Sequence, residues 1–185
     1  MPGQPEDPSR AYLDLLITAG RLKRESRRGW VRKLGLRDPE SVADHSYRTA
    51  LMAMLFSDLR GMDTEKVLKM ALLHDLPEAI TGDITPGERT RKQKVRLESA
   101  AMRQILERIP HKQRDEYWEA WLEFNRGRSK EARLVKQLDK LEMAVQASEY
   151  RKESGLSTDE FIESARAGIE DQDLLVMLRL VSGRG

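Results

Sequence analysis

The chain has 185 residues, of which 33 are Lys or Arg, 31 are Asp or Glu, and none is Cys. Without Cys there is no disulfide framework, no thiol nucleophile and no Cys-ligated zinc or iron–sulfur site, and a formal charge of +2 indicates no particular class of partner. No stretch approaches the ~18 unbroken apolar residues of a membrane span, so we expect a soluble, cytoplasmic protein with no membrane partner. We expect a flexible leader at 1–8 and a single domain over 9–185, because a chain of this length can bury one core.

The composition favours helix, since Leu, Ala, Glu, Arg and Lys dominate and no window alternates apolar and polar residues as a half-buried strand does. Caps and breakers predict helices at 9–23, 41–59, 64–76, 91–107, 112–124, 130–152, 157–167 and 171–181. Ser41 and Asp44 have the spacing of a capping box, and Pro77 ends the helix before it. The residues at 24–39 are basic and are expected to be irregular. The sequence therefore predicts an all-α protein, a single compact helical bundle.

The helix at 41–59 is apolar nearly all round in its middle, at 50–56, which predicts a central buried helix. The apolar residues at 174, 175, 178 and 180 either complete the core or serve a dimer.

Three histidines are available as nitrogen ligands in a chain without Cys: His45, His74 and His111. His45 shares a helical stripe with Val42 and Thr49, and His74 shares one with Val67 and Ala71. Both imidazoles are therefore expected to face the interior, where a polar group needs a partner. His111 follows Pro110 and is expected to be exposed.

Two carboxylates lie at positions that a core does not favour. Asp75 is close to a helix C-terminus, where a negative charge opposes the macrodipole. Asp139 occupies the stripe of Val135 and Met143 and is directed at the core. Taken singly, these residues are explained by a distorted helix end and by an interhelical ion pair, and an inward histidine by a hydrogen bond. A divalent cation held by all of them explains them together.

The pattern His45…His74-Asp75…Asp139 resembles the metal signature of the HD-domain phosphohydrolases. The blocks PESVADHSYR (39–48), ALLHDLPEA (71–79), TGDITP (81–86) and EARLVKQLD (131–139) resemble the 5′-deoxynucleotidase branch of that family, and the similarity extends over about 12–152. The resemblance implies an all-helical HD domain and hydrolysis of deoxyribonucleoside 5′-monophosphates to deoxynucleoside and phosphate by metal-activated water. It also implies a homodimer.

By the same resemblance, His45, His74, Asp75 and Asp139 hold one divalent ion. The acidic residues after the His-Asp pair correspond to Glu78 and Asp83, the candidate catalytic acids. Manganese or cobalt suits the mixed nitrogen and oxygen donors best, while iron(II), magnesium, nickel or zinc are alternatives.

The substrate residues implied by the resemblance are Arg27 and Trp30, with Arg24 and Arg28 as rivals of Arg27. From the residues alone, Arg27 belongs to a basic run that also fits a solvated face, and Trp30 equally fits an anchor to the core. Lys136, one turn before Asp139, either contacts phosphate or pairs with Asp139.

The two acids have ordinary explanations as well. Glu78 fits a first-turn carboxylate favoured by the helix dipole as well as a general base, and Asp83 fits an Asx turn as well as a proton carrier or a substrate contact.

Two other functions compete with the deoxynucleotidase. The first keeps the metal and takes another nucleotide, such as a cyclic nucleotide or an alarmone. The second is a basic helical module that binds nucleic acid around a structural metal. We do not expect a nucleic-acid partner, because the sequence contains no helix-turn-helix, zinc-finger or RNP signature.

Overall fold

The computed structural model describes residues 8–183. The flexible leader predicted at 1–8 lies outside the described residues except for Pro8, which begins the first helix. Within the described range, the chain forms helices and two isolated bridges but no β-strand, which confirms the all-α prediction. None of the helices in this range is long and apolar enough to cross a bilayer.

The elements follow the predicted order closely. They are α1 (Pro8–Ala19), η1 (Gly20–Lys23), α2 (Arg28–Leu34), α3 (Val42–Leu59), α4 (Thr64–Leu73), α5 (Glu78–Thr81), α6 (Arg91–Leu106), α7 (His111–Arg126), α8 (Lys130–Ser154), α9 (Asp159–Gly168) and α10 (Gln172–Ser182). The capping box of α3 is present, since the Ser41 side chain accepts from the amide of Asp44 and the Asp44 carboxylate accepts from the amide of Ser41.

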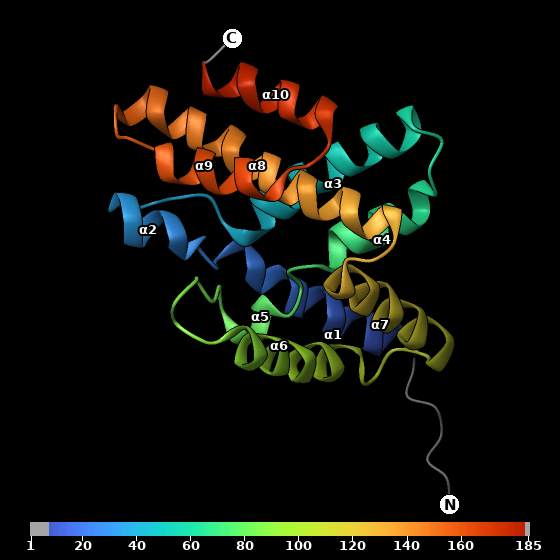
Figure 1. The fold of residues 1–185 in the computed structure, drawn as a ribbon. Helices are drawn as coiled ribbons and strands as arrows, with labels where there is room; N and C mark the ends of the chain where they lie inside the picture. Colours follow the sequence, from blue (N-terminus) through green and yellow to red (C-terminus); the bar gives the residue numbers. More distant parts are fainter. Residues whose placement is uncertain (1–7, 184–185) are drawn as a thin grey trace, which may run out of the picture.

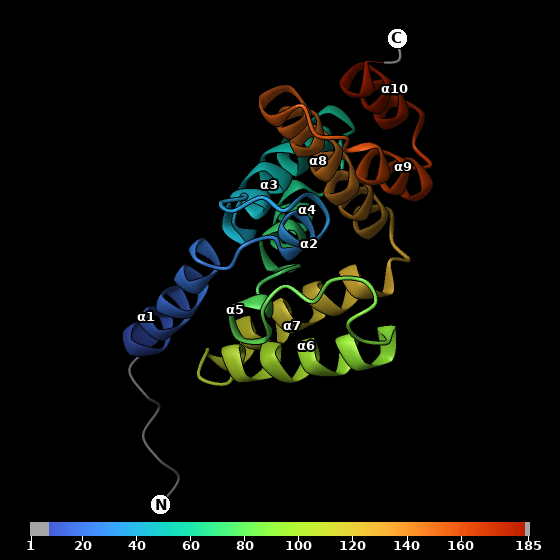
Figure 2. The same cartoon turned by 90° about the vertical axis from the view of Figure 1, so that its left-hand side faces the viewer.

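The helices form two groups, as Figures 1 and 2 show from two directions. In one group, α8 packs against α3, α4, α9 and α10, and these helices share a core with Trp30 of α2. In the other group, α6 and α7 pack together beside α1 and α5 around Met102, Leu106 and Trp121. The turn from α4 into α5 connects the two groups, and this turn carries two of the predicted metal ligands.

The prediction of an irregular segment at 24–39 is wrong in its middle, where α2 forms. The first amide of α2, that of Arg28, donates a 2.7 Å hydrogen bond to the carboxylate of Asp83. Trp30 is 2% exposed and holds the helix to the core. α2 ends at Gly35, whose φ of 68° suits a residue without a Cβ. Both contacts that stabilise this short helix come from distant parts of the chain, so a local pattern does not reveal it.

Two predicted helices end earlier than expected. The first helix ends at Ala19, and the chain continues as the 3-10 helix η1. The helix that begins at Thr64 ends at Leu73, and His74 to Pro77 form a turn before α5. Pro77 disfavours helical geometry at the residue before it, Leu76. The helix ends three residues earlier still, at Leu73.

The prediction that α3 is buried all round is wrong for one face. Tyr47, Leu51, Leu55 and Leu59, spaced four residues apart, are 73, 41, 57 and 77% exposed. The opposite face, with His45 at 0%, packs against α8. Among the apolar residues near the C-terminus, Leu174 and Leu178 are buried in the core, whereas Leu180 is exposed.

Candidate metal centre and active site

The four predicted metal ligands meet at one point. Nε2 of His45 lies 3.4 Å from Nε2 of His74 and 3.2 Å from Oδ1 of Asp139. Oδ2 of Asp75 lies 3.1 Å from Nε2 of His74 and 3.7 Å from Nε2 of His45. These atoms come from α3, from the turn after α4 and from the middle of α8, so three separate segments converge as their helical stripes predict.

Both imidazoles present Nε2 to this point because Nδ1 is occupied elsewhere. Nδ1 of His74 donates to the carbonyl of Ala71 over 2.7 Å. Nδ1 of His45 is hydrogen-bonded to a carboxylate oxygen of Glu142. A carbonyl oxygen accepts only, so Nδ1 of His74 carries the proton and Nε2 is the nitrogen left for a ligand. On His45 the contact with Glu142 takes up Nδ1 in the same way, so Nε2 faces the cluster. This is the arrangement of histidines that ligate a metal.

The electrostatics of the cluster favour a cation. Burial disfavours the ionised form of Asp139, but Lys140 and a hydrogen bond from His45 outweigh it and hold the pKa of Asp139 well below its usual value. Burial and Arg27 lower the pKa of His45, yet Asp139 and Glu142 raise it to about 9. A field that holds a proton on a fully buried imidazole also attracts a divalent ion.

The donor set fits a divalent metal. Among the described residues, ligand atoms of His45, His74 and Asp139 lie within 4.8 Å of one another, and Asp75 joins them through its contacts with both imidazoles. Two imidazole nitrogens and two carboxylates suit a first-row transition metal and leave positions open on a six-coordinate ion.

A cavity of about 400 Å³ opens beside the ligands. Asp75 and Asp139 form part of its wall, together with Trp30, Met143 and Phe161. Its polar lining includes Arg27, Arg32, Lys33, Glu78, Asp83, Lys94, Lys140 and Ser164. The cavity therefore combines cationic groups, which suit a phosphate, with an aromatic and apolar wall, which suits a sugar or a base.

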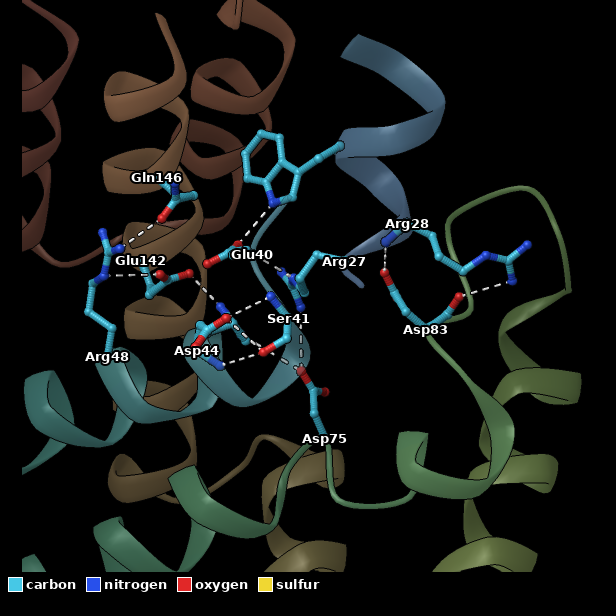
Figure 3. A network of polar contacts seen from close by, with 12 residues as sticks. Arg27, Arg28, Glu40, Ser41, Asp44, Arg48, Asp75, Asp83, Glu142 and Gln146 are labelled. Carbon is cyan, nitrogen blue, oxygen red and sulfur yellow. Dashed lines mark hydrogen bonds and ion pairs between the residues drawn. The ribbon is translucent and has the colours of Figure 1, made fainter. Parts of the chain in front are cut away.

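Arg27 is the arginine that lies at the ligands. Its Nη1 is 3.4 Å from Oδ2 of Asp75 and its Nε is 3.9 Å from Oε1 of Glu40, and Figure 3 shows it between the two carboxylates. The two rivals lie elsewhere: Arg24 is exposed, and the guanidinium of Arg28 points to Glu88 at 3.1 Å.

Trp30 anchors α2 and lines the cavity at the same time. Its Nε1 donates to Oε1 of Glu40 over 2.9 Å, and its ring packs on Phe161 with the centroids 4.0 Å apart. Tyr150 meets it edge-on at 5.2 Å.

Glu78 is 2% exposed and lines the cavity. Burial raises its pKa well above the usual value, and Asp75 and Asp83 raise it further, while Lys94 acts against them from 3.6 Å. The Oε2 atom of Glu78 has no hydrogen-bond partner among the described residues. A buried carboxyl with a raised pKa and a free oxygen is suited to accept a proton at neutral pH.

Asp83 also lines the cavity, but one of its carboxylate oxygens is hydrogen-bonded to the first turn of α2. Oδ2 accepts the amide of Arg28, and the Asp83 carbonyl accepts Nη1 of the same arginine over 3.3 Å (Figure 3). Its amide donates to Glu25 over 3.1 Å. These contacts fix the start of α2 and thereby place Arg27. The catalytic role expected of Asp83 stays a prediction.

Lys136 is not brought to the cavity. Its Nζ lies 4.4 Å from the centroid of Phe124, and the residue is absent from the cavity wall, so its phosphate contact stays a prediction. Three lysines that sequence reasoning missed line the wall instead: Lys33, Lys94 and Lys140, the last with Nζ 3.3 Å from Oδ2 of Asp139. His111 is exposed, as predicted.

Glu142 is another residue that sequence reasoning missed. It is 0% exposed and contacts His45 from α8. A signal was present in the sequence, because a residue three positions after Asp139 shares its helical face.

Comparison with known proteins agrees with this geometry. The family model described as "HD domain" matches residues 19–174. The 5′-deoxynucleotidase HDDC2 of Homo sapiens is 45% identical over 143 residues, which cover 77% of this chain and 69% of that protein. The Danio rerio protein of the same name is 38% identical over 170 residues, which cover 90% of this chain and 84% of that protein.

A solved structure has the same architecture. A conserved hypothetical protein from Pyrococcus furiosus superimposes with a TM-score of 0.75 at 36% identity, covering 92% of this chain and 99% of its own. Since the family model spans most of the sequence and the similar proteins align over most of their length, the chain belongs to the HD domain family.

Proposed function

We propose that this chain is a metal-dependent 5′-deoxynucleotidase, which converts deoxyribonucleoside 5′-monophosphates to deoxynucleosides and phosphate. The observation that carries the proposal is the convergence of His45, His74, Asp75 and Asp139 beside a cavity whose wall includes Asp75, Asp139 and Arg27. The relatives named 5′-deoxynucleotidase, at 45 and 38% identity, support the choice of substrate.

The four convergent residues are the proposed ligands of one divalent ion, with manganese or cobalt favoured over iron(II), magnesium, nickel and zinc. When bound, such an ion supplies a Lewis acid that lowers the pKa of water and offsets charge on a phosphoryl group. A second ion is not part of the proposal.

The chain's own residues then bind the substrate and move protons. Arg27 is positioned to hold phosphate oxygens through two parallel hydrogen bonds. Trp30 offers part of the apolar wall to the sugar, and Lys94 and Lys140 add positive charge to the wall. Glu78 is the proposed general base that takes a proton from the attacking water through its free Oε2.

Phosphoryl transfer asks mainly for position and electrostatic stabilisation. The half-buried Arg27 meets both requirements, because Asp75 and Glu40 fix its guanidinium and leave its charge beside the cavity.

A panel of nucleotides with a free-phosphate readout tests the function. Deoxyribonucleoside 5′-monophosphates should release phosphate, chelation should abolish the release, and added manganese or cobalt should restore it. If a cyclic nucleotide or an alarmone is turned over in preference to the monophosphates, the protein is a phosphohydrolase of that nucleotide and not a 5′-deoxynucleotidase. No turnover of any nucleotide, with nucleic-acid affinity that falls steeply with salt and survives chelation, would favour the binding module.

We also propose that the protein is a cytoplasmic homodimer, as the resemblance implies. The exposed apolar stripe of α3 supports the dimer, because Tyr47, Leu51, Leu55 and Leu59 form a row that a second copy can cover. The absence of Cys fits a reducing compartment.

A further inference from the structure

We propose that Glu142 is a positioning residue of the metal centre: it accepts the Nδ1 proton of His45, fixes the ring and its tautomer, and so directs Nε2 to the ion. This inference rests on the proposed metal-dependent function. It assigns a role to a buried acid outside the ligand set and outside the cavity wall.

The contact joins two helices through matching faces. His45 and Arg48 are three residues apart on α3, and Glu142, Gln146 and Glu149 follow each other on one face of α8. The carboxylate of Glu142 is hydrogen-bonded to Nδ1 of His45 through Oε2, while Oε1 lies 3.5 Å from Nε of Arg48. One buried carboxylate thus meets an imidazole on one side and a guanidinium on the other.

Arg48 is itself held in place. Its Nη2 donates to the side-chain oxygen of Gln146 over 2.7 Å, and its Nη1 donates to Glu149 over 3.0 Å. Figure 3 shows Arg48 reaching from α3 toward Glu142 and Gln146. Because Gln146 and Glu149 of α8 fix the guanidinium, Glu142 has a charged partner in a defined position before any ligand binds.

The two histidines differ in what fixes them. His74 donates to the backbone carbonyl of Ala71, a neutral acceptor that no side-chain substitution removes. The orientation of the His45 ring depends instead on a side chain, that of Glu142. A carboxylate that accepts from the distal nitrogen of a metal-bound imidazole increases the basicity of the ligating nitrogen, and loss of such a partner typically weakens metal binding by about 10–100-fold.

A second cation at the Nδ1 side is the competing explanation, because Glu40, His45 and Glu142 also have ligand atoms within 4.8 Å of one another. Oε1 of Glu40 accepts from Nε1 of Trp30 over 2.9 Å, while its buried Oε2 has no hydrogen-bond partner among the described residues. The number of ions bound per chain therefore separates the two explanations.

The test compares Glu142→Gln and Glu142→Ala with Glu149→Gln, a matched control that also removes a carboxylate partner of Arg48 but does not contact His45. Cobalt is titrated into each chelator-treated protein and followed by its visible absorption spectrum. Bound metal per chain is counted, and the melting temperature of the metal-free protein is recorded. The metal-free melting temperature separates weaker metal binding from weaker folding.

We expect Glu142→Ala to bind cobalt about 10–100-fold more weakly with an altered spectrum. Glu142→Gln, whose amide oxygen still accepts from Nδ1, should restore the spectrum and part of the affinity. Glu149→Gln should match the wild type, which should bind one ion per chain.

Three results would overturn the inference: unchanged cobalt affinity and spectrum in both Glu142 variants, two ions per chain in the wild type, or an equal loss in Glu149→Gln. If Glu142→Ala does not fold, Glu142→Gln decides through its affinity alone. Cobalt binding is measured without substrate, so a wrong substrate class leaves this result readable, and a wrong role for Glu142 leaves the nucleotide panel readable.

Discussion

Glu78 is the general base of the proposed reaction. Replacing it by Gln keeps the size of the side chain but removes the proton acceptor, so we expect phosphate release to fall by about 10²–10⁴-fold, the usual contribution of a general base. Metal content should stay at the wild-type value, because Glu78 lies outside the ligand set. Steady-state phosphate release and metal analysis on the same sample provide the measurement.

Glu98 offers a control for this substitution. It is buried and its Oε1 lies 3.3 Å from the Nζ of Lys94, the same lysine that faces Glu78, but it does not line the cavity. Glu98→Gln should therefore retain turnover within a few-fold. Full turnover by Glu78→Gln with metal bound would remove Glu78 from the role of base.

The ligand residues could be predicted because helical periodicity is a local property. The stripe of Val42 and Thr49 directs His45 inward, and Asp139 follows the same logic on α8. The choice of Arg27 over Arg28 could not be made from spacing, since it depends on Asp75 and Glu40.

The longest side chains were the least predictable. Lys136 and Asp139 share a helical face, yet the lysine extends toward Phe124 instead of the cavity. The spacing of residues along a helix determines on which face a Cα lies, but it does not determine the direction of a flexible lysine side chain. Glu142 was within reach of the same periodicity argument as Asp139, whereas its partner Arg48 on α3 depends on how the two helices pack.

At the scale of elements, helices with their own caps were predictable and the helix stabilised from a distance was not. α3 has a local capping box at Ser41, and its predicted range agrees with the structure. α2 depends on Asp83 and on the burial of Trp30, which only the folded chain provides. The early end of α4 places Asp75 beyond the helix, in the turn that connects the two groups.

The junction of α3 with α10 gives a prediction about pH. Asp171 caps α10 by accepting from the amides of Asp173 and Leu174, and Arg60 donates to its two oxygens over 2.7 and 2.9 Å. The hydrogen bond from Arg60 lowers the pKa of Asp171 below its ordinary value of 3.8. The ion pair therefore stabilises the fold above pH 3.8, and this stability is lost as the pH falls through the lower folded-state pKa.

Asp171→Asn isolates this pair, because Asn is also a good N-cap. At pH 7 we expect a loss of about 0.5–1 kcal/mol in the free energy of unfolding, a modest value because the pair is partly open to solvent. The difference from the wild type should disappear below the folded-state pKa. Urea unfolding over a pH series measures it, and in an Arg60→Ala background the same substitution should have little effect. A constant difference at all pH values would contradict the assignment.

At the scale of the whole molecule, the exposed apolar surface bears on assembly. The row from Tyr47 to Leu59 spans about 18 Å of α3 at 1.5 Å per residue. α1 adds four more exposed apolar side chains, those of Tyr12, Leu13, Leu16 and Ile17. His45 lies on the opposite face of α3, so one helix contributes to the proposed metal centre on one side and to the proposed dimer on the other.

A charge in the middle of the α3 row should therefore separate the protomers. We expect the wild type to sediment as a dimer and Leu55→Glu as a monomer, because a carboxylate buried in an apolar interface has no partner to offset its desolvation. Leu180→Glu on α10 is the matched control: Leu180 is 71% exposed but lies outside the α3 row, so this variant should remain a dimer. Sedimentation equilibrium over a range of concentrations gives the mass, with metal content as a check on folding. A monomeric wild type, or a dimer that survives Leu55→Glu, would place the α3 row outside any interface between copies.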